Sequence, residues 1–588
     1  MYYDHNLKGL NSEFVDKMNQ SELLYMTDEG RLLFNNGNAV FLDDHQLELD
    51  LVLRGKKKNS KFLILFGVGD GRYLDAIREY FPDLERLIII EPDMGYLKLS
   101  FREFDYKKLS TQKLIIDLYH SRDLQPLKEK LFGLFEGIID FDLIALPSYI
   151  VNFQELYSNL VKAIQDILIV RKDNLNTFTS SFLQWNVNQI KNLKYSIHHI
   201  EDYKDYFKGK NVIIVGAGPS LNKNIHLLEK LKEHAVLIAA GSAIKILNKN
   251  NIIPDFRIAI DGLPREMKLI GDIEDLDVPL LYSDMLYFEF LPTYNAKKTI
   301  HFISEEEIIS NDFYETKNHK RYTFRSGGSV TNSAFDICSK MEAKRIILMG
   351  QDLAYENDKL HADGAWEDKS RIKGTMKHEY VKMKNIYGEE VNTIKPFLTV
   401  KHSFELYMDY LADTEKTQYL NATEGGLPIR GIPNISAEDL LNLIGKDQKE
   451  AFEFIEDLRE VEPNLIQYFK KINEDLRHIY DVISDLNISL YKIKDMLNET
   501  SKKNKIMHEV EYYKKKFAII QTNNTYRFLL QRMTDMIGNV GRVSHGSEEE
   551  LKRAYKIEEM KLAHLKSNVI ALVKTIEAEL AVLEGKNE

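Results

Sequence analysis

One stretch constrains the fold more than any other: an apolar run followed at once by a glycine loop and a helix start. Residues 211–215 read NVIIV, and GAGPSL follows at 216–221. The β-branched run predicts a buried strand, and Pro219 suits a first helical turn because its missing N–H costs little there. Glycines at such a turn let a backbone approach a phosphate closely. The stretch predicts a strand–loop–helix unit, with a nucleotide site or a ligand-free tight turn as the two alternatives.

Similar units recur between residues 205 and 445. The expected strands are Val212–Val215, Val236–Ala240, Phe256–Ile260, Leu280–Ser283, Thr299–Ile303 and Arg345–Met349. The expected helices are 222–232, 243–250, 305–315 and 329–341. Short apolar strands that alternate with helices predict a doubly wound α/β domain, in which a mostly parallel sheet is covered on both faces.

Polar residues follow the ends of several of these strands. They lie at 216–220, 241–242, 261–262 and 350–352, and a further polar turn, 325–329, precedes a helix. Ligands of open α/β sheets bind beyond the carboxyl ends of the strands. Asp261 or Asp352 alone could be a helix cap, but polar ends gathered at one edge predict a shared nucleotide pocket.

Length and composition limit the classes of protein to which the chain can belong. The 588 residues are too many for one core, and we place domains at 1–200, 201–445 and 446–588. A net charge of −11 argues against nucleic acid as a partner. The single cysteine, Cys338, excludes an intrachain disulfide and is expected in the core. Because neither a secretory signal nor an apolar run of membrane length is visible, we expect no membrane span and a cytoplasmic protein.

The N-terminal region predicts a Rossmann-like domain. A strand at 61–66 precedes the glycines Gly67, Gly69 and Gly71, and the next strand ends at Glu91. We expect residues 47–53 to form a short strand or an entry segment. This layout resembles S-adenosylmethionine methyltransferases, in which the acid binds ribose hydroxyls. The alternative, a domain that binds no cofactor, is favoured because no further methyl-transfer signature follows.

The C-terminal region predicts a bundle of antiparallel helices. Apolar residues recur at helical spacing in 465–486, 510–537 and 562–583, and the last helix is expected from about 548 to 583. A further helix is expected to begin with Phe452, Phe454, Ile455 and Leu458.

Motifs of the central region resemble those of the motility-associated (Maf) flagellin glycosyltransferases. They are GAGPSL at 216–221, PDF at 254–256 with Asp261, GGSV at 327–330, IILMGQDLAY at 346–355 and NATEGG at 421–426. The resemblance implies transfer of a nonulosonic acid, such as pseudaminic or legionaminic acid, from a CMP ester to Ser or Thr hydroxyls of flagellin, with inversion. The same domain is shared with archaeal hydroxymethylpterin diphosphokinases, so an ATP-dependent pterin pyrophosphokinase is an alternative. A non-catalytic flagellin-binding scaffold is another.

A more remote resemblance, to bacterial sialyltransferases that use a CMP-sugar, suggests which residues hold the donor. It covers the glycine loop, the serine–glycine turn and a Gly-x-Asp strand end followed by tyrosine. Together with the strand-end pattern it assigns the donor nucleotide to Gly216, Gly218, Ser220, Ser242, Asp261, Ser326, Gly327, Gly328, Ser329 and Asp352. The Maf resemblance further suggests that Gln351, Asn421 and Glu424 hold the sugar or the acceptor.

Transfer requires a donor of hydrogen bonds to the departing phosphate and a base for the acceptor hydroxyl. Tyr355 matches the family tyrosine that donates to the phosphate. The candidates for the base are His402, which is favoured by its position just before an expected helix at 404–411, His361 and, as a weaker third, His378. Residues 354–400 lack periodicity and are expected to form a lid. No metal-ligand spacing is visible, so we expect no metal and no cofactor other than the CMP-sugar substrate.

Overall fold

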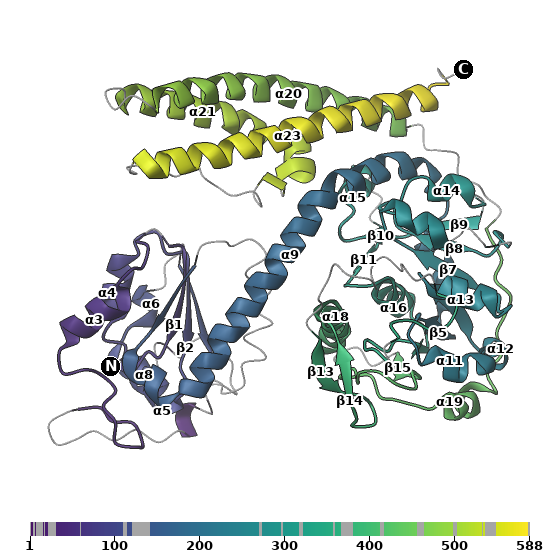
Figure 1. The fold of residues 1–588 in the computed structure, drawn as a ribbon, viewed down its shortest axis with the longest axis horizontal. Coiled ribbons are helices and arrows are strands. Elements are labelled where there is room, and N and C mark those ends of the chain that lie inside the picture. The colour runs from purple at the N-terminus through teal and green to yellow at the C-terminus, as the bar shows by residue number, and fades with distance from the viewer. Residues whose placement is uncertain are drawn as a thin grey trace. The chain divides into compact units, whose positions relative to one another are not determined.

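The computed structural model divides the chain into two compact units, Met1–Phe178 and Thr179–Glu588. The division lies within α9, a single helix of 39 residues, Gln154–Asn192 (Figure 1). The structure describes residues 2–585 except 4–5, 7–15, 17, 21–30, 59, 110–113, 120–140, 270–272, 274, 296–297, 317–320, 357–358, 366–379, 412–416, 456–463, 498–502, 532 and 535–547.

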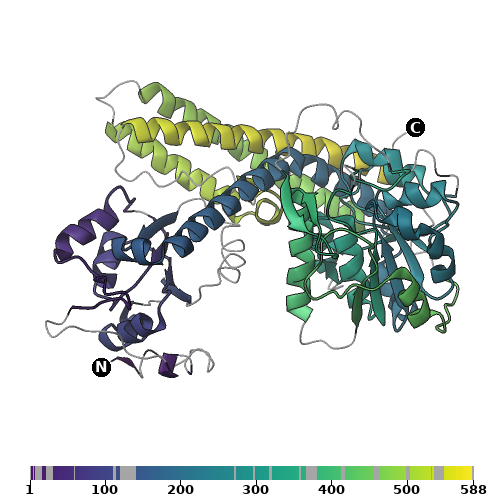
Figure 2. The same ribbon diagram turned by 60° about the horizontal axis from the view of Figure 1, so that its bottom comes forward.

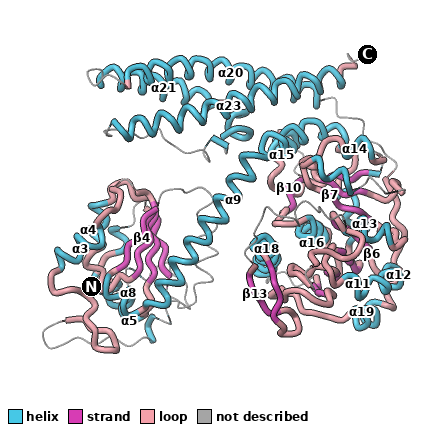
Figure 3. Tube along the Cα trace, viewed as in Figure 1, coloured by secondary structure: helices cyan, strands magenta, loops and turns pink. Residues whose placement is uncertain are grey.

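The N-terminal unit contains one parallel sheet in the order β3-β2-β1-β4. Figure 3 shows the strands in magenta with helices beside them. The strands are β1 (Phe62–Phe66), β2 (Arg86–Ile90), β3 (Ile115–Tyr119) and β4 (Phe141–Ala145), and the helices are α3 (His45–Leu53), α4 (Leu74–Tyr80), α5 (Met94–Glu103), α6 (Tyr106–Leu109) and α8 (Pro147–Asn152). The expectation of a strand at 47–53 is wrong. The Asp44 side chain caps α3 by accepting from the Leu47 N–H, which favours a helix there.

Aromatic rings of the same unit pack against its glycine loop. A Cβ atom added to Gly67 would lie 2.3 Å from the Tyr149 ring, and one added to Gly69 would lie 2.3 Å from Phe41. Glu91 is fully buried and turns inward, accepting from the main-chain N–H of Val68 at 2.8 Å. Burial raises the pKa of Glu91 to about 8. Glu91 is the acid that would bind a ribose in a methyltransferase. Here it is hydrogen-bonded to the glycine loop of its own unit instead.

The second unit is built on a sheet of seven parallel strands in the order β15-β12-β5-β6-β7-β8-β9. The strands are β5 (Asn211–Val215), β6 (Val236–Ala240), β7 (Phe256–Ala259), β8 (Leu280–Tyr282), β9 (Thr299–His301), β12 (Arg345–Met349) and β15 (Gln418–Asn421). Six match the expected strands, and β15 is an addition. Side chains of β5 alternate between two buried clusters, one on each face of the sheet, as a doubly wound sheet requires.

Short helices join these strands. They are α10 (Lys204–Phe207), α11 (Leu221–Asn224), α12 (Leu228–Lys232), α13 (Ala243–Lys249), α14 (Phe290–Thr293), α15 (Ile308–Glu315), α16 (Val330–Lys340) and α19 (Ala437–Ile444). Cys338 lies in α16 and is fully buried, as expected. The region expected to be a lid contains an antiparallel hairpin, β13 (Val381–Lys384) with β14 (Glu390–Thr393), and helix α18 (Lys395–Leu411) follows it. A small parallel pair, β10 (Ile303–Ser304) with β11 (Thr323–Phe324), lies between β9 and β12 in sequence.

The C-terminal helices pack as expected. Helix α20 (Asn464–Met496) packs against both α21 (Lys503–Thr522) and α23 (Glu548–Leu583) (Figures 1 and 2). The expected helix start at 452 is wrong, because residues 451–455 are not helical. Instead Phe452 packs against Phe256 and Tyr206 of the sheet domain, at ring-centroid distances of 4.7 and 5.0 Å. Leu458 lies outside the described residues. Among the helices of the described residues, none is long and apolar enough to cross a bilayer.

Candidate functional site

The site is built where the sheet changes direction. From β5 the chain proceeds outward to β9 on one side, and it later adds β12 and β15 on the other. The loops that follow β5 and β12 therefore leave adjacent strands, and such a switch point is where open α/β sheets bind ligands. The two loops are joined directly, because the N–H groups of Gly216 and Gly218 donate to the carbonyls of Met349 and Gly350 at 2.8 and 2.7 Å.

This close approach explains the glycines of the GAGPSL loop. A Cβ atom at Gly216 would lie 2.6 Å from the carbonyl oxygen of Gly350, and one at Gly218 would lie 1.9 Å from a carboxylate oxygen of Asp352. The sequence suggests that the glycines admit a phosphate, whereas in the structure they admit the neighbouring loop. Their N–H groups are engaged within the chain, so a phosphate would depend on other donors of the cavity.

Asp352 connects the two loops. Its carboxylate accepts from the Ser220 N–H at 3.0 Å and from the Ser220 hydroxyl at 2.8 Å, and both residues are buried. Burial raises the pKa of Asp352 to about 6, although the bonds from Ser220 oppose that shift. At neutral pH the group is therefore a buried carboxylate held by two donors.

A cavity of ≈ 280 Å³ lies at this switch point. Eight of the residues predicted to belong to the site line it: Gly216, Gly218, Ser242, Asp261, Ser329, Gln351, Asp352 and His361. Ser329, Val330 and Thr331 bring the N-terminus of the 11-residue helix α16 to the wall. Ala240, Val330, Leu360 and Phe397 supply apolar surface. We call this space the donor cavity.

A second cavity, of ≈ 360 Å³, shares Asp352 and Ala354 with the donor cavity. Its wall includes Tyr355 and residues of the β13–β14 hairpin and its turn. Burial raises the pKa of the Tyr355 phenol, which therefore keeps its proton at neutral pH. We call this space the hairpin cavity.

The other predicted residues line neither cavity. The Ser220 side chain is directed to Asp352, and Ser326 donates to Glu306 at 2.6 Å. Gly327 and Gly328 lie close to Asn332 and Val400. Asn421 is fully buried and donates to Asn434, while Glu424 accepts from the Ala437 N–H at the start of α19.

The structure places the two main candidates for the base, His361 and His402, in different surroundings. His361 lines the donor cavity. His402 lies in the interior of α18, so the expectation of a position just before a helix is wrong: the helix begins at Lys395, seven residues earlier. His402 also lies outside the walls of both cavities. A weaker third candidate, His378, is outside the described residues.

Glu266 belongs to the site but is not predicted by the sequence patterns. This residue lies in a 3₁₀ turn, Pro264–Leu269, that follows β7, and it lines the donor cavity with an exposed fraction of only 7%. Burial above all, and then the charge of Asp261, raise the pKa of Glu266 to about 8. The only signal in the sequence is its place five residues after Asp261, in the same turn.

The donor cavity is acidic. Asp261, Glu266 and Asp352 line it, and the described lining residues include neither lysine nor arginine. Asp261 is neutralised by Arg265, whose Nε and Nη2 donate to the same carboxylate oxygen at 2.8 and 2.6 Å. A phosphate in this cavity would therefore depend on the positive end of α16 and on neutral donors.

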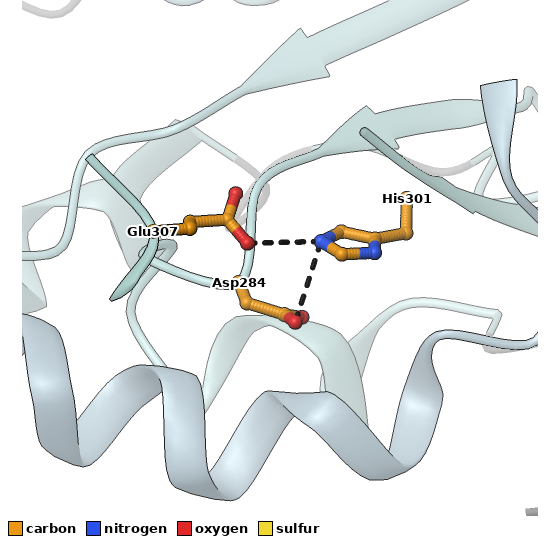
Figure 4. A group of neighbouring side chains, drawn as sticks. All are labelled: Asp284, His301 and Glu307. Atoms are coloured by element: carbon orange, nitrogen blue, oxygen red, sulfur yellow. Dashed lines mark hydrogen bonds and ion pairs between the residues drawn. The ribbon is translucent and has the colours of Figure 1, made fainter. Parts of the chain in front are cut away.

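A separate group could hold a metal ion. Asp284, His301 and Glu307 are fully buried, and one ligand atom from each lies within 4.8 Å of the others (Figure 4). His301 Nε2 lies 3.3 Å from Asp284 and 3.1 Å from Glu307. These are ligand types of divalent cations, but the same distances suit a protonated histidine between two carboxylates. Three residues on separate segments give no sequence spacing to recognise, and the expectation that no metal is required stays a prediction.

The second unit is a doubly wound α/β domain with a cavity at the switch point of its sheet. The structure of a Maf glycosyltransferase from Magnetospirillum magneticum AMB-1 has the same fold: the match has a TM-score of 0.55 and covers 98% of this chain and 95% of that chain, at 13% identity. The resemblance to Maf proteins that the motifs indicate is therefore confirmed in the fold.

Two further similarities are found at the level of sequence. A family model described as "6-hydroxymethylpterin diphosphokinase MptE-like" matches residues 187–358. A 6-hydroxymethyl-7,8-dihydropterin pyrophosphokinase of Methanocaldococcus jannaschii is 39% identical over 67 residues, which is 11% of this chain. The match spans 28% of that relative's length.

Proposed function

We propose that the chain is a glycosyltransferase that moves a nonulosonic acid of the pseudaminic or legionaminic type from a CMP ester to Ser or Thr hydroxyls of flagellin, with inversion. One observation carries this proposal: a cavity at the switch point of the sheet, in a chain whose fold follows that of a Maf glycosyltransferase along almost its whole length. The acceptor, the sugar and the nucleotide rest on the motifs that resemble that family.

The donor phosphate would bind at the start of α16. The dipole of α16 gives its N-terminus a positive end. The hydroxyls of Ser329 and Thr331 lie at the same point, 3.0 Å apart, and Ser329 already accepts from the Thr331 N–H. A CMP ester has a single phosphate, which suits a cavity in which α16 supplies the positive field.

The sugar would lie toward the shared wall of the two cavities. Negative charge grows on the phosphate as the bond to the sugar breaks, and a hydrogen-bond donor directed there lowers the barrier. The Tyr355 phenol lines the adjoining hairpin cavity and stays protonated at neutral pH. We assign Tyr355 to the departing phosphate, and we assign the sugar and the acceptor to the shared wall of the two cavities, at Asp352 and Ala354.

The proton of the acceptor hydroxyl requires a base near the sugar. The geometry favours His361 for this role, because it lines the donor cavity and His402 lines neither cavity. The order of preference is thus the reverse of the one that the sequence suggests.

An ATP-dependent pterin pyrophosphokinase is the second candidate, and the two sequence matches favour it. A triphosphate brings more negative charge than a CMP ester, however, and the described walls of the donor cavity contain no lysine or arginine to neutralise it. We therefore rank this activity below glycosyl transfer. The third candidate, a scaffold that binds flagellin without catalysis, does not explain why the cavity is present.

Two measurements test the proposal. A thermal-shift screen compares CMP, CTP, ATP and S-adenosylmethionine, and we expect cytidine nucleotides to raise the melting temperature of the full chain. A transfer assay incubates the chain with a CMP-nonulosonic acid and flagellin, and the intact mass of flagellin should rise by the mass of the sugar residue. Stabilisation by ATP alone, without transfer, would favour the pyrophosphokinase.

A further inference from the structure

The last turns of α9 carry three buried amide side chains. Asn188, Gln189 and Asn192 are each at most 1% exposed. A buried amide is retained in native proteins where its polar atoms have hydrogen-bond partners. All three have them on segments outside α9: Gln189 Oε1 accepts from the Ile309 N–H at 2.9 Å, and the two asparagines donate to loops of the sheet. Hydrogen bonds from this end of α9 therefore reach the edge of the sheet at which the loops follow β7 and β8.

Asn188 joins two loops that follow neighbouring strands. Its Nδ2 donates to the carbonyl of Gly262, after β7, at 3.0 Å, and to the carbonyl of Met285, after β8, at 2.8 Å. Its Oδ1 accepts from Gln184, one turn earlier on α9, at 2.8 Å, which fixes the orientation of the amide. An amide nitrogen has two hydrogens, whereas an aspartate of the same shape has none to offer to either carbonyl. The two contacts therefore require asparagine.

Gly262 lies in a narrow space between α9 and the loop after β8. A Cβ atom there would lie 2.7 Å from the Trp185 ring, 2.8 Å from the Met285 carbonyl oxygen and 2.9 Å from Asn188 Nδ2. Real Cβ atoms do not approach other atoms so closely, so this position requires glycine. The main chain at Gly262 is thus held by a hydrogen bond from Asn188 and is enclosed by the atoms around it.

The same segment forms part of the wall of the donor cavity. Asp261, which directly precedes Gly262, and Glu266, which follows it, both line the cavity. The Asp261 carbonyl also accepts from the Tyr287 N–H at 3.1 Å. Asn188 itself lines neither cavity. Binding sites depend on such supporting residues, because a wall that moves by about 1 Å no longer fits its ligand.

We propose that Asn188 is a positioning residue for the donor. By binding the Gly262 carbonyl, it keeps the segment after β7, and with it one wall of the donor cavity, where a CMP ester can bind. The inference rests on the proposed function and adds to it a residue outside the cavity on which donor binding depends. An amide with a purely structural role would stabilise the fold without an effect of its own on the affinity for the donor.

Asn192 provides the matched control. Like Asn188 it is a fully buried asparagine on the same face of α9. Its Nδ2 also donates to two main-chain carbonyls, those of Asp284 and Leu286, at 3.0 and 2.6 Å. Both carbonyls belong to the loop after β8, and the described residues that line the two cavities include none of 283–287. Removing either amide takes a donor from two carbonyls, so the two alanine variants should lose similar stability.

The test compares Asn188→Ala with Asn192→Ala in the full chain. We expect both variants to melt at a lower temperature than the wild type, by similar amounts. Isothermal titration calorimetry, at a temperature at which circular dichroism shows all three proteins folded, should give CMP binding about ten- to hundredfold weaker in Asn188→Ala. Asn192→Ala should bind CMP as the wild type does. In the transfer assay, Asn188→Ala should raise the KM for the CMP-nonulosonic acid and leave the KM for flagellin unchanged.

Gly262→Ala tests the same contact from its other side. The φ of Gly262 lies outside the left-handed region, so alanine adds no backbone strain, but the Cβ atom forces the segment away from Asn188 and Met285. We expect the same loss of CMP affinity as in Asn188→Ala. The double variant should bind CMP little more weakly than either single variant, because both changes act on one contact. Since Gly262→Ala removes no hydrogen-bonding group, it also serves if Asn188→Ala does not fold.

The outcomes separate this inference from the proposed function. CMP binding weakened equally in Asn188→Ala and Asn192→Ala would mean a general loosening around α9, and unchanged binding in Asn188→Ala would mean that the wall keeps its place without the amide. Both results overturn the inference and leave the cytidine donor intact. A wild type that binds AMP but no cytidine nucleotide would overturn both proposals together.

Discussion

Ser220 donates twice to Asp352, from its main-chain N–H at 3.0 Å and from its hydroxyl at 2.8 Å. This pair connects the loop after β5 to the loop after β12. Because both residues are buried and Asp352 is ionised at neutral pH, the contact belongs to the stronger class of hydrogen bonds. It holds one wall of the donor cavity in place and gives GAGPSL a structural role in addition to any ligand contact.

Replacing Ser220 by Ala should lower the free energy of unfolding by about 1.5–3 kcal/mol, because a buried carboxylate loses a donor. Urea unfolding at pH 7 measures the change. Ser484→Ala is the matched control: its hydroxyl bonds only to the Tyr480 carbonyl of the same helix, so a loss within about 0.5 kcal/mol is expected. Equal losses in the two variants would contradict a special role for the pair.

A Gly218→Ala substitution should damage the site by crowding, because the φ of Gly218 lies outside the left-handed region and alanine there adds no backbone strain. The added Cβ atom would lie 1.9 Å from the Asp352 carboxylate and 2.6 Å from the Gly350 carbonyl, so one of the two loops has to move. We expect a lower melting temperature and loss of stabilisation by CMP. Gly209→Ala is the comparison variant: alanine is strained at its φ of +73°, but nothing lies within 4 Å, so it should lower the melting temperature and keep the stabilisation by CMP. Stabilisation by CMP retained in Gly218→Ala would contradict the crowding.

Glu266→Gln should stabilise the folded chain, and more at pH 8 than at pH 5. The folded-state pKa of about 8 exceeds the ordinary value of 4.5, so the folded chain keeps a proton that the unfolded chain releases. Wild-type stability therefore falls as the pH rises from about 4.5 to 8, and glutamine removes that loss. Melting temperatures of both proteins at the two pH values measure it. A gain that is the same at pH 5 and pH 8 would contradict the raised pKa.

His301→Gln should destabilise the chain most at low pH. Burial lowers the pKa of His301, but the charges of Asp284 and Glu307 outweigh burial and leave it above 6.5. A raised histidine pKa contributes stability that is present below 6.5 and is lost as the pH rises through the folded-state value. We expect a loss of about 3–5 kcal/mol at pH 6 and a smaller one at pH 8, from urea unfolding.

The control for His301→Gln is His226→Gln, an exposed histidine on a 3₁₀ turn, which should be neutral at both pH values. A bound metal would keep His301 unprotonated. In that case treatment with a chelator would lower the stability of the wild type and leave that of the variant nearly unchanged.

His361→Gln should lower kcat for sugar transfer by about 10²–10⁴-fold, as loss of a general base does, with little change in the affinity for CMP. His402→Gln should retain most of the activity, because that residue lies in α18 away from both cavity walls. Initial rates with saturating donor and flagellin provide the comparison. Loss of activity in His402→Gln alone would restore the assignment that the sequence suggests.

Much of the fold could be predicted because the strands are short, apolar and fully buried. Residues 212–215, 236–240 and 346–349 have the unbroken apolar pattern of strands covered on both faces. Strand β15, with the sequence QYLN, is too short and polar to be recognised and forms because β12 offers it an open edge. Apolar and acidic residues alternate in the first part of 47–53, which is typical of a strand, but the Asp44 side chain caps a helix there.

The site was only partly predictable. Strand ends such as Asp261 and Asp352 are visible in the sequence because the sheet brings carboxyl ends to one edge. Which atoms face the cavity depends on contacts between loops that are distant in sequence: Ser220 turns to Asp352, and Glu424 turns to the start of α19. Glu266 was missed because a glutamate in a turn resembles any surface residue until its burial is known.

The aromatic rings that pack against Gly67 and Gly69 have a practical consequence. In the N-terminal unit, the Tyr149 and Phe41 rings take up the space beside the glycines that a cofactor would otherwise approach. Because these rings fill the space that a cofactor would need, we expect added nucleotides to leave the melting temperature of this unit unchanged. In a melting experiment on the full chain it therefore acts as a built-in reference, and a transition that shifts with CMP can be assigned to residues Thr179–Glu588.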